Sequence, residues 1–391
     1  MANVSSSNGL EKRPKLRFPG FDEPYRECQI GDIYAERSQR GAGDMELLSV
    51  TMNDGVMPRS EIEGKDSSSE DKSNYKVVCK GDMVYNSMRM WQGANGVSDY
   101  DGIVSPAYTV LMPTKEIDNQ YFAALFKTSK LINEFRKNSQ GLTSDTWNLK
   151  YPQIRPIRLH IPSLQEQHKL SAFIGTLEER ISKQRQLVDS LKKYKRGLLS
   201  DLFGEKLTQE WTTSRHYFSE IAQRRGEKYD PSSGIEYPCV ELENIEQETG
   251  KILATVPSIE QGSIKNMAKS GDTLFGKLRP YLRKYAFAQQ TMVCSSEIWA
   301  LIPSDVVLPK FLFYLVQTEQ FLRVANISSG TKMPRAEWSN IEKAEFHIPD
   351  LPVQRKVVSL LEGMDRRIAF ADSMLICLNR LKASLLQQLF I

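Results

Sequence analysis

A run of cations and aromatic residues stands out between Lys277 and Lys284. This stretch, KLRPYLRK, holds four cations, one tyrosine and no acid. Lysine and arginine neutralise DNA phosphates, and arginine also pairs with base edges through two hydrogen bonds. An isolated charged loop is more often a solvated surface, but this composition suits DNA. The residues expected to contact DNA here are Lys277, Arg279, Tyr281, Arg283 and Lys284.

Three further polar loops have a similar character. They are RMWQG from Arg89, GLTSDTW from Gly141 and GTKMPR from Gly330. Because such loops recur at matched places in an internal repeat, a DNA contact is favoured over a solvated surface for them too. The residues expected to contact DNA in these loops are Arg89, Trp91, Gln92, Thr143, Ser144, Lys332 and Arg335.

Motifs for catalysis are incomplete or missing. The string GDTLFGKL from Gly271 fits the first part of a phosphate-binding loop, but Leu278 stands where Ser or Thr must ligate magnesium. Pro280 also follows where a helix is required. Glu241 and Glu243 share a face of a predicted strand without a companion histidine, which favours a solvated or hydrogen-bonding role. No HExxH, GxSxG or amino-methyltransferase string occurs. We therefore expect no catalytic centre, no metal site and no cofactor in this chain.

The amino-acid composition excludes only a few classes of protein. The 391 residues include 52 Lys plus Arg and 48 Asp plus Glu, and the net charge of +4 neither requires nor excludes nucleic acid. The five cysteines are scattered, which is typical of a reducing cytosol and of neither a disulfide framework nor a zinc cluster. No apolar run approaches the ~20 residues that span a bilayer. A soluble, cytoplasmic protein is expected.

The chain contains a long internal repeat. The segment that starts at Lys80 aligns without a gap with the segment that starts at Ser270, at an offset of 190. A second block, HIPSLQEQHKL from His160, pairs with HIPDLPVQRKV from His347 at an offset of 187. The order is therefore A–B–A′–B′. The identical pairs of the first block include Gly81/Gly271, Asp82/Asp272, Arg89/Arg279, Ser105/Ser295, Leu111/Leu301 and Pro113/Pro303.

The A segments have the composition of mixed α/β domains of about 140 residues each. Helical patterns cover Asn119–Asn138 and Pro309–Asn326. Short strand-like runs are separated by the turn-forming residues Gly, Pro and Asp. The expected strands are Glu46–Thr51, Tyr75–Cys79, Ala107–Leu111, Pro238–Leu242 and Ile298–Ile302.

Each B segment predicts one long helix with a heptad seam, which is typical of a coiled coil. About 40 residues make a rod of roughly 60 Å, too long for one small domain to cover, so the two helices are expected to pack on each other. The alternative is that each helix packs only on its own domain. The expected interface residues are Leu170, Ile174, Leu177, Ile181, Val188, Leu191, Leu198, Leu202, Val357, Leu361, Met364, Ile368, Leu375, Leu378, Leu385 and Leu389.

Two lysines interrupt this apolar seam. Lys195 and Lys382 occupy equivalent positions of the two helices. A polar seam residue sets the register of a coiled coil, or else its stem lies in the seam while its ammonium reaches solvent. The sequence leaves both interpretations open.

These features together resemble the DNA-specificity subunit of type I restriction-modification systems. The strings that carry the resemblance are PKLRFPGF, RMWQGA with VSPAYTVLMP, FGKLRPYLRKY with CSSEIW, GTKMPR, IPSLQEQ and IPDLPVQ, set in the A–B–A′–B′ order. The resemblance implies two pseudo-symmetric α/β target-recognition domains separated by two antiparallel spacer helices that form a coiled coil. The implied boundaries are 1–18 for a flexible N-terminal segment, 19–160 and 206–347 for the domains, and 161–205 and 348–391 for the helices.

The resemblance also implies a function without catalysis. Each domain would recognise one half of a bipartite, asymmetric DNA target, and helix length would set the gap between the halves. Two adenine-methyltransferase subunits would supply S-adenosylmethionine, and restriction subunits would add ATP- and magnesium-dependent chemistry. The chain would then bind double-stranded DNA and these partners, without a membrane. Two alternatives are a duplicated coiled-coil scaffold that binds no DNA, and a self-sufficient nuclease or methyltransferase.

Overall fold

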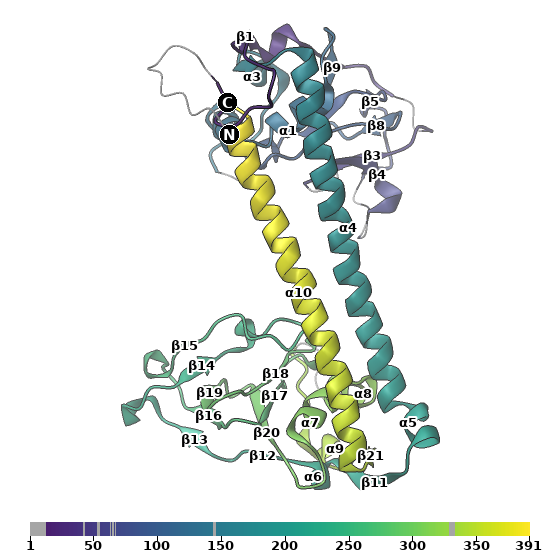
Figure 1. Cartoon of the computed structure of the whole chain (residues 1–391), viewed down its shortest axis with the longest axis vertical. Coiled ribbons are helices and arrows are strands. Elements are labelled where there is room, and N and C mark those ends of the chain that lie inside the picture. The colour runs from purple at the N-terminus through teal and green to yellow at the C-terminus, as the bar shows by residue number, and fades with distance from the viewer. Residues whose placement is uncertain are drawn as a thin grey trace. The chain divides into compact units, whose positions relative to one another are not determined.

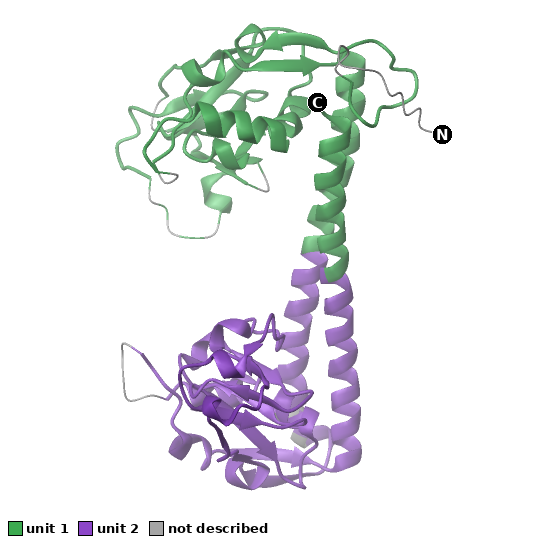
Figure 2. Ribbon diagram, turned by 90° about the vertical axis from the view of Figure 1, so that its left-hand side faces the viewer, with its two compact units in different colours: residues 1–185, 373–391 green, residues 186–372 purple. Residues whose placement is uncertain are grey.

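The computed structural model describes residues 13–41, 44–52, 55–62, 64, 66, 68–143, 146–327 and 333–391. The chain divides into two compact units, coloured separately in Figure 2. Unit 1 comprises Met1–Arg185 and Ser373–Ile391, and unit 2 comprises Gln186–Asp372. Each unit combines an α/β domain with part of both long helices, which confirms the predicted mixed α/β class. None of the helices in the described ranges has the length and apolar character needed to cross a membrane.

The domain of unit 1 is built on a four-stranded antiparallel sheet. Its order is β2 (Tyr34–Glu36), β9 (Tyr108–Pro113), β6 (Met83–Asn86) and β7 (Asn95–Val97). Three antiparallel strand pairs accompany it: β3 (Leu48–Thr51) with β4 (Gly55–Pro58), β5 (Lys76–Val78) with β8 (Gly102–Val104), and β1 (Arg26–Gln29) with β10 (Arg158–Ile161). The last pair joins the beginning of the domain to its end.

Unit 2 repeats this sheet in the same order and register. Its strands are β12 (Ala222–Arg224), β20 (Ile298–Pro303), β17 (Thr273–Gly276) and β18 (Tyr285–Phe287). Met83 pairs with Leu111 in unit 1 as Thr273 pairs with Leu301 in unit 2. The five strands of the second sheet are β13 (Lys228–Tyr229), β16 (Lys265–Ala268), β19 (Met292–Cys294), β14 (Pro238–Val240) and β15 (Val256–Pro257), and β11 (Thr213–Tyr217) pairs with β21 (Glu345–Pro349). The repeat in sequence is thus a repeat in fold.

Each expected helical stretch of a domain is broken into two helices. They are α1 (Asn119–Leu125) and α2 (Ser129–Asn138) in unit 1, and α7 (Pro309–Leu315) and α8 (Glu319–Ala325) in unit 2. A threonine causes each break: the hydroxyl of Thr128 accepts from the Leu131 amide, and that of Thr318 accepts from the Phe321 amide. Because this contact caps the N-terminus of a helix, one helix ends before the threonine and a second begins after it. The short helices are α3 (Tyr151–Ile154), α5 (Glu205–Glu210), α6 (Phe218–Ile221) and α9 (Trp338–Ile341).

The repeated Gly-Asp dipeptide stabilises the same turn in both units. Asp82 accepts two hydrogen bonds from Arg37, of 2.7 and 3.1 Å, and Asp272 accepts two from Arg225, of 2.6 and 2.9 Å. Each aspartate also accepts from a backbone amide three residues earlier. The preceding Gly81 has a φ of +90°, in the left-handed region that favours glycine. The identity of these residues between the copies therefore has a structural cause.

The two long helices are α4 (Leu164–Phe203) and α10 (Leu351–Leu389), which begin where the repeated HIP strings predict (Figure 1). In unit 1, Leu170 belongs to the same core cluster as Leu389, while Ile181 lies further along α4 beside Leu378. In unit 2, the ammonium of Lys192 is 4.0 Å from Asp372 and that of Lys195 is 2.6 Å from Asp365. Within each unit the helices therefore pack antiparallel.

All sixteen expected interface residues are buried or half-buried, but their surroundings differ. Leu170, Ile174 and Leu389 belong to the core of the unit 1 domain, and Val357 and Leu361 belong to that of unit 2. A separate cluster joins the two helices in unit 1 through Leu177, Ile181, Leu375, Leu378 and Leu385. The helices thus pack both on the domains and on each other.

Both seam lysines form ion pairs between the helices. Lys195 lies 2.6 Å from Asp365, and Lys382 lies 2.5 Å from Glu178. The two pairs are equivalent in the repeat, since each partner is offset by 187. Only 7% of Lys195 is exposed, and its ammonium also lies 5.5 Å from the Tyr314 ring centre. The Tyr314 hydroxyl donates to Asp365, and burial raises the pKa of this tyrosine.

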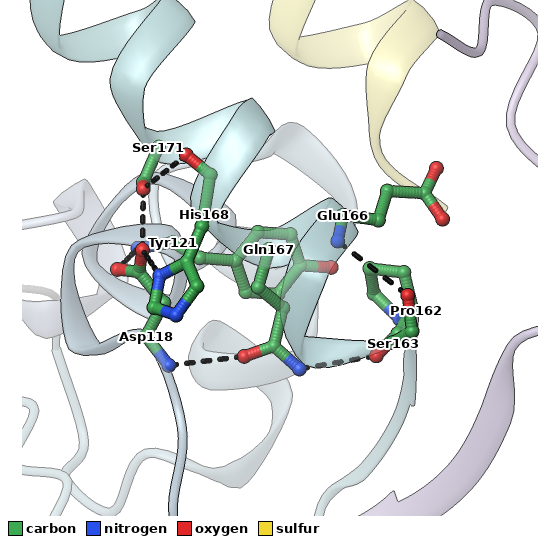
Figure 3. A network of polar contacts seen from close by, with 8 residues as sticks. All are labelled: Asp118, Tyr121, Pro162, Ser163, Glu166, Gln167, His168 and Ser171. Carbon is green, nitrogen blue, oxygen red and sulfur yellow. Dashed lines mark hydrogen bonds and ion pairs between the residues drawn. The ribbon is translucent and has the colours of Figure 1, made fainter. Parts of the chain in front are cut away.

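A buried glutamine joins the start of each long helix to its domain. Gln167 accepts from the Asp118 amide at 3.1 Å and donates to the Pro162 carbonyl at 3.0 Å (Figure 3). Gln354 accepts from the Leu308 amide at 2.8 Å and donates to the carbonyls of Val306 and Pro349. The conserved spacing of the IPxLxxQ opening thus places the same amide at the same junction in both units.

The N-terminal segment also contacts the long helices. Arg17 makes two hydrogen bonds with Glu166, of 2.9 and 2.7 Å. The Leu16 amide donates to the Gln388 carbonyl, and the Phe18 ring lies 5.7 Å from that of Phe173. Residues 13–18, expected to belong to a flexible segment, therefore make specific contacts in unit 1. Residues 1–12 of that segment lie outside the described ranges.

We expect Gln354→Leu to lower the free energy of unfolding by about 2–4 kcal/mol. The change leaves a buried amide and two buried carbonyls without their partner, and each such group costs about 1–3 kcal/mol. Urea unfolding followed by circular dichroism measures the change. The matched control is Gln320→Leu, because Gln320 is only half-buried and its hydrogen bond to the Glu345 carbonyl is exposed. Equal stability of the two variants would contradict the anchoring role.

We expect Lys195→Ala to destabilise the protein by about 2–3 kcal/mol, because it removes a buried ammonium and leaves the half-buried Asp365 without its cation. The double variant Lys195→Met/Asp365→Leu should recover much of that loss, since a hydrophobic pair replaces both charges. The same unfolding measurement tests this. Lys183→Ala, which removes an exposed pair with Glu179, should change little. A double variant no more stable than the single one would refute the explanation.

Candidate nucleic-acid interface

In unit 1 the backbone brings the two expected DNA loops together. The Leu149 amide donates to the Ser87 carbonyl at 2.8 Å, and Gln140 and Asn148 exchange backbone hydrogen bonds. The first loop contains a short 3-10 helix, Met90–Gln92. The loop that begins at Gly141 therefore lies beside the loop that follows β6.

A pair of tryptophans joins these loops. The rings of Trp91 and Trp147 meet edge to face, with centroids 5.2 Å apart, and the Trp91 indole donates to the Met88 carbonyl. Trp147 was not among the expected contacts, although it closes the quoted GLTSDTW string. Edge-to-face pairs of this kind stabilise a defined geometry. The two rings therefore fix the conformation of the loop surface.

The remaining expected residues of unit 1 differ in their roles. Arg89 is exposed and Gln92 is half-buried, and neither side chain has a hydrogen-bond partner among the described residues. The Thr143 amide donates to the Thr146 hydroxyl, which closes the loop internally. Ser144 lies outside the described residues. Of the expected DNA contacts in unit 1, Arg89 and Gln92 are thus side chains without a hydrogen-bond partner among the described residues.

Unit 2 brings its two loops together with the equivalent hydrogen bond. The Ala336 amide donates to the Lys277 carbonyl at 2.8 Å, and Ala336 and Lys277 correspond to Leu149 and Ser87 in the repeat. The Arg279 amide also donates to the Pro334 carbonyl. Lys332 lies outside the described residues. The matched pair of loops is thus a property of the repeated fold.

The cations of the KLRPYLRK stretch divide into inward and outward groups. Arg283 lies 2.7 Å from Glu319 and 3.5 Å from Glu248, and the Lys284 ammonium donates to the Leu242 carbonyl. These two side chains therefore hold the loop to its own domain. Arg279 is exposed without a side-chain partner among the described residues, and Tyr281 is 52% exposed.

Arg335 is exposed but already paired. Its guanidinium makes two hydrogen bonds with Glu297, of 3.0 and 3.3 Å, and these raise the pKa of Arg335 above its ordinary value. A phosphate would compete with this carboxylate for the same donors. Arg335 is therefore held in a defined position and contributes little unbalanced charge.

Sequence reasoning missed a cavity in unit 2. It measures about 500 Å³, and Arg224, Lys228, Lys277, Trp299 and Trp338 are among its lining residues. The Arg224 guanidinium lies 4.8 Å from the Trp338 ring centre. Except for Lys277 and for Trp299, which closes the CSSEIW string, these residues lie in segments that no motif singled out. Their common surroundings appear only when β12, β20 and α9 are assembled.

The other candidates for chemistry have structural contacts. Glu241 pairs with Lys265 at 2.5 Å, in keeping with the expected hydrogen-bonding role. Burial raises the pKa of Cys239 to about 11 and that of Cys294 to about 12, so both are thiols at neutral pH. In the part of the chain that the structure describes, no group of three or more His, Cys, Asp or Glu side chains could hold a metal ion.

Known proteins are similar to this chain in sequence and in fold. The chain is 25% identical over 291 residues to the type I restriction enzyme EcoDI specificity subunit of Escherichia coli, and the match spans 64% of each protein, just under two thirds. The type-I restriction-modification system S subunit from M. genitalium has a TM-score of 0.57 at 14% identity and covers 97% of this chain and 99% of its own. A chain from a study of type I R-M complex assembly has a TM-score of 0.59 at 16% identity, over 96% and 99%. At these identities the solved structures show the fold alone.

The family match follows the repeat. Two separate segments, 28–192 and 225–375, match the type I restriction modification DNA specificity domain. The first segment contains the four-stranded sheet of unit 1, and the second contains that of unit 2 except for β12, which ends at Arg224. Each segment also contains a pair of loops and part of a long helix. Since the two segments make up most of the chain, it belongs to the type I restriction modification DNA specificity domain family and carries two copies of the domain.

Proposed function

We propose that this chain recognises a bipartite, asymmetric DNA target, one half with each unit, and directs partner subunits to it. The observation that carries the proposal is the matched loop pair. The same backbone hydrogen bond, from Leu149 to Ser87 and from Ala336 to Lys277, builds it in both units. Two domains that recognise different DNA sequences in the same way need the same backbone frame with different side chains on it.

The side chains on the loops suit recognition of different bases. Unit 1 offers Arg89 and Gln92, and unit 2 offers Arg279 beside the exposed ring of Tyr281. Arginine pairs best with guanine and glutamine with adenine through the major groove. The surrounding cations would contact phosphates, which set affinity and position but not sequence. The two half-sites should therefore differ in sequence.

The long helices would set the distance between the half-sites. A 40-residue helix such as α4 is about 60 Å long. The glutamine junctions and the ion pairs of Lys195 and Lys382 hold each domain to both helices within its own unit. A recognition domain fixed to a continuous helix would contact its half-site only at a defined distance from the other half-site.

Catalysis would reside in partner subunits. Two methyltransferase subunits would bring S-adenosylmethionine to an adenine in each half-site, and restriction subunits would bring ATP and magnesium. The similarity to a restriction enzyme's specificity subunit supports this division of labour. The chain would act where the host DNA lies, in the cytoplasm, without a cofactor of its own.

We expect Arg279→Ala to relax recognition at one base of a single half-site, and Arg89→Ala to do so in the other half. Losing a two-hydrogen-bond contact to a base costs about 1–3 kcal/mol, or roughly five- to 150-fold in methylation rate at that position. Single-molecule methylome sequencing of hosts that carry each variant reads the motif directly. Arg323→Ala, at an exposed arginine of α8 outside both loops, is the control. If both variants methylate the unchanged motif at the unchanged rate, neither arginine contacts a base.

We expect a heptad inserted in both long helices, after Gln186 and after Ser373, to widen the gap between the half-sites. Seven residues add about 10 Å while keeping the apolar seam, which corresponds to about three base pairs. The methylated motif of the variant measures the gap. Both half-site sequences should stay the same, which serves as the internal control. A gap of the original length would refute the spacing role of the helices.

A further inference from the structure

We propose that the cavity of unit 2 binds a phosphate of the DNA backbone and that unit 1 has no equivalent site. The inference rests on the proposed function and adds an asymmetry to it. The cavity holds about 500 Å³ and lies between β12, the segment around Lys277, and α9. The side chains around it combine positive charge with an aromatic wall.

Three of the four cations that line the cavity have no acidic partner among the described residues. Arg225 is committed to Asp272, at 2.6 Å, and also lies 3.6 Å from Glu227. The Lys228 ammonium donates only to the neutral side chain of Asn266, at 2.5 Å. Arg224 and Lys277 have no ion pair there. The cavity therefore holds three uncompensated positive charges, which favours an anion.

The aromatic side chains hold the Arg224 guanidinium in a position that suits phosphate binding. Its guanidinium lies 4.8 Å from the ring centre of Trp338 and 5.8 Å from that of Trp299. The two rings meet edge to face with centroids 5.6 Å apart. A guanidinium stacked on an aromatic face keeps its N–H edge free for a two-point contact with phosphate. The donor is thus positioned before the ligand arrives.

The cavity lies next to the loops proposed to recognise bases. Lys277 lines the cavity, and its backbone is hydrogen-bonded to Ala336 and Glu297 of the neighbouring segments. Ser296, another lining residue, precedes the Glu297 that pairs with Arg335. A phosphate in the cavity would therefore belong to the same duplex that the Arg279 loop contacts.

Unit 1 has the same frame but lacks the stacked arginine and both tryptophans. Glu36 pairs with Leu111 in the sheet as Arg224 pairs with Leu301, so an acid replaces the stacked arginine. That acid is bound to Lys76 at 3.2 Å. The equivalents of Lys277, Trp299 and Trp338 are Ser87, Thr109 and Tyr151. The Ser87 and Thr109 hydroxyls hydrogen-bond each other at 2.8 Å, buried and uncharged. A backbone phosphate would thus be bound at this place in unit 2 alone.

The test compares the salt dependence of DNA binding. The full chain, in the complex in which it is isolated from its host, is titrated with a duplex that carries its methylated motif between 50 and about 200 mM salt. We expect Arg224→Ala/Lys277→Ala to reduce the slope of log affinity against log salt by about one, and to weaken binding about tenfold near 0.1 M salt. The methylated motif should stay unchanged. Lys269→Ala, whose ammonium already pairs with Glu227, is the control and should keep the slope.

The possible results separate this inference from the proposed function. If the wild-type complex binds the duplex and the double variant keeps the full slope, the cavity inference is overturned and the proposed function stands. If the wild-type complex binds no duplex, both are overturned. Inorganic phosphate that saturably changes tryptophan fluorescence in the wild type, while the double variant keeps the DNA slope, would mark a free-anion site and also overturn the inference. A single Arg224→Lys should retain most of the slope, since it keeps the charge.

Discussion

The buried glutamine at the opening of each long helix is the contact on which both units depend. Its side chain satisfies a domain amide on one side and the carbonyl of the helix-leading proline on the other, at Gln167 and again at Gln354. Hydrogen bonds buried at a junction are costly to break, because no water replaces the lost partner. The direction in which each helix leaves its domain is therefore specified, and with it the segments of the other helix that it meets within the unit.

The structure separates a repeated frame from an unrepeated surface. The Arg–Asp turn of Arg37 and Arg225, the threonine cap that splits the domain helices, and the ion pairs of Lys195 and Lys382 all occur twice. In the first loop of each pair, RMWQG of unit 1 aligns with RPYLR of unit 2, and only the arginine is shared. A duplicated scaffold with divergent surfaces allows one chain to hold two different recognition sites in the same way.

Much of the fold follows from sequence patterns. Each of the five expected strands overlaps an observed strand, and the long helices begin at the expected place, because strand-like runs between turn residues and heptad patterns are local and strong. The break at Thr128 and Thr318 was missed, since the apolar pattern runs through both threonines and only the hydroxyl contact starts a new helix. The roles of individual cations were harder to predict. Arg283 contacts Glu319 and Lys284 contacts the Leu242 carbonyl, and no local sequence pattern indicates these contacts.

The sequence by itself determined the duplication, the alternation of α/β domains with long amphipathic helices, and the polar loops at matched places of the two copies. These features are encoded by the spacing and periodicity of residues, which can be recognised in the amino-acid sequence alone. Tertiary structure decided which charges are free. Arg335 is neutralised by Glu297 and Arg225 by Asp272, whereas Arg224 is stacked on Trp338 without an acid, and every one of these partners is distant in sequence. The electrostatic character of a cation depends on its neighbours in space, so only the folded chain could place the anion cavity in unit 2.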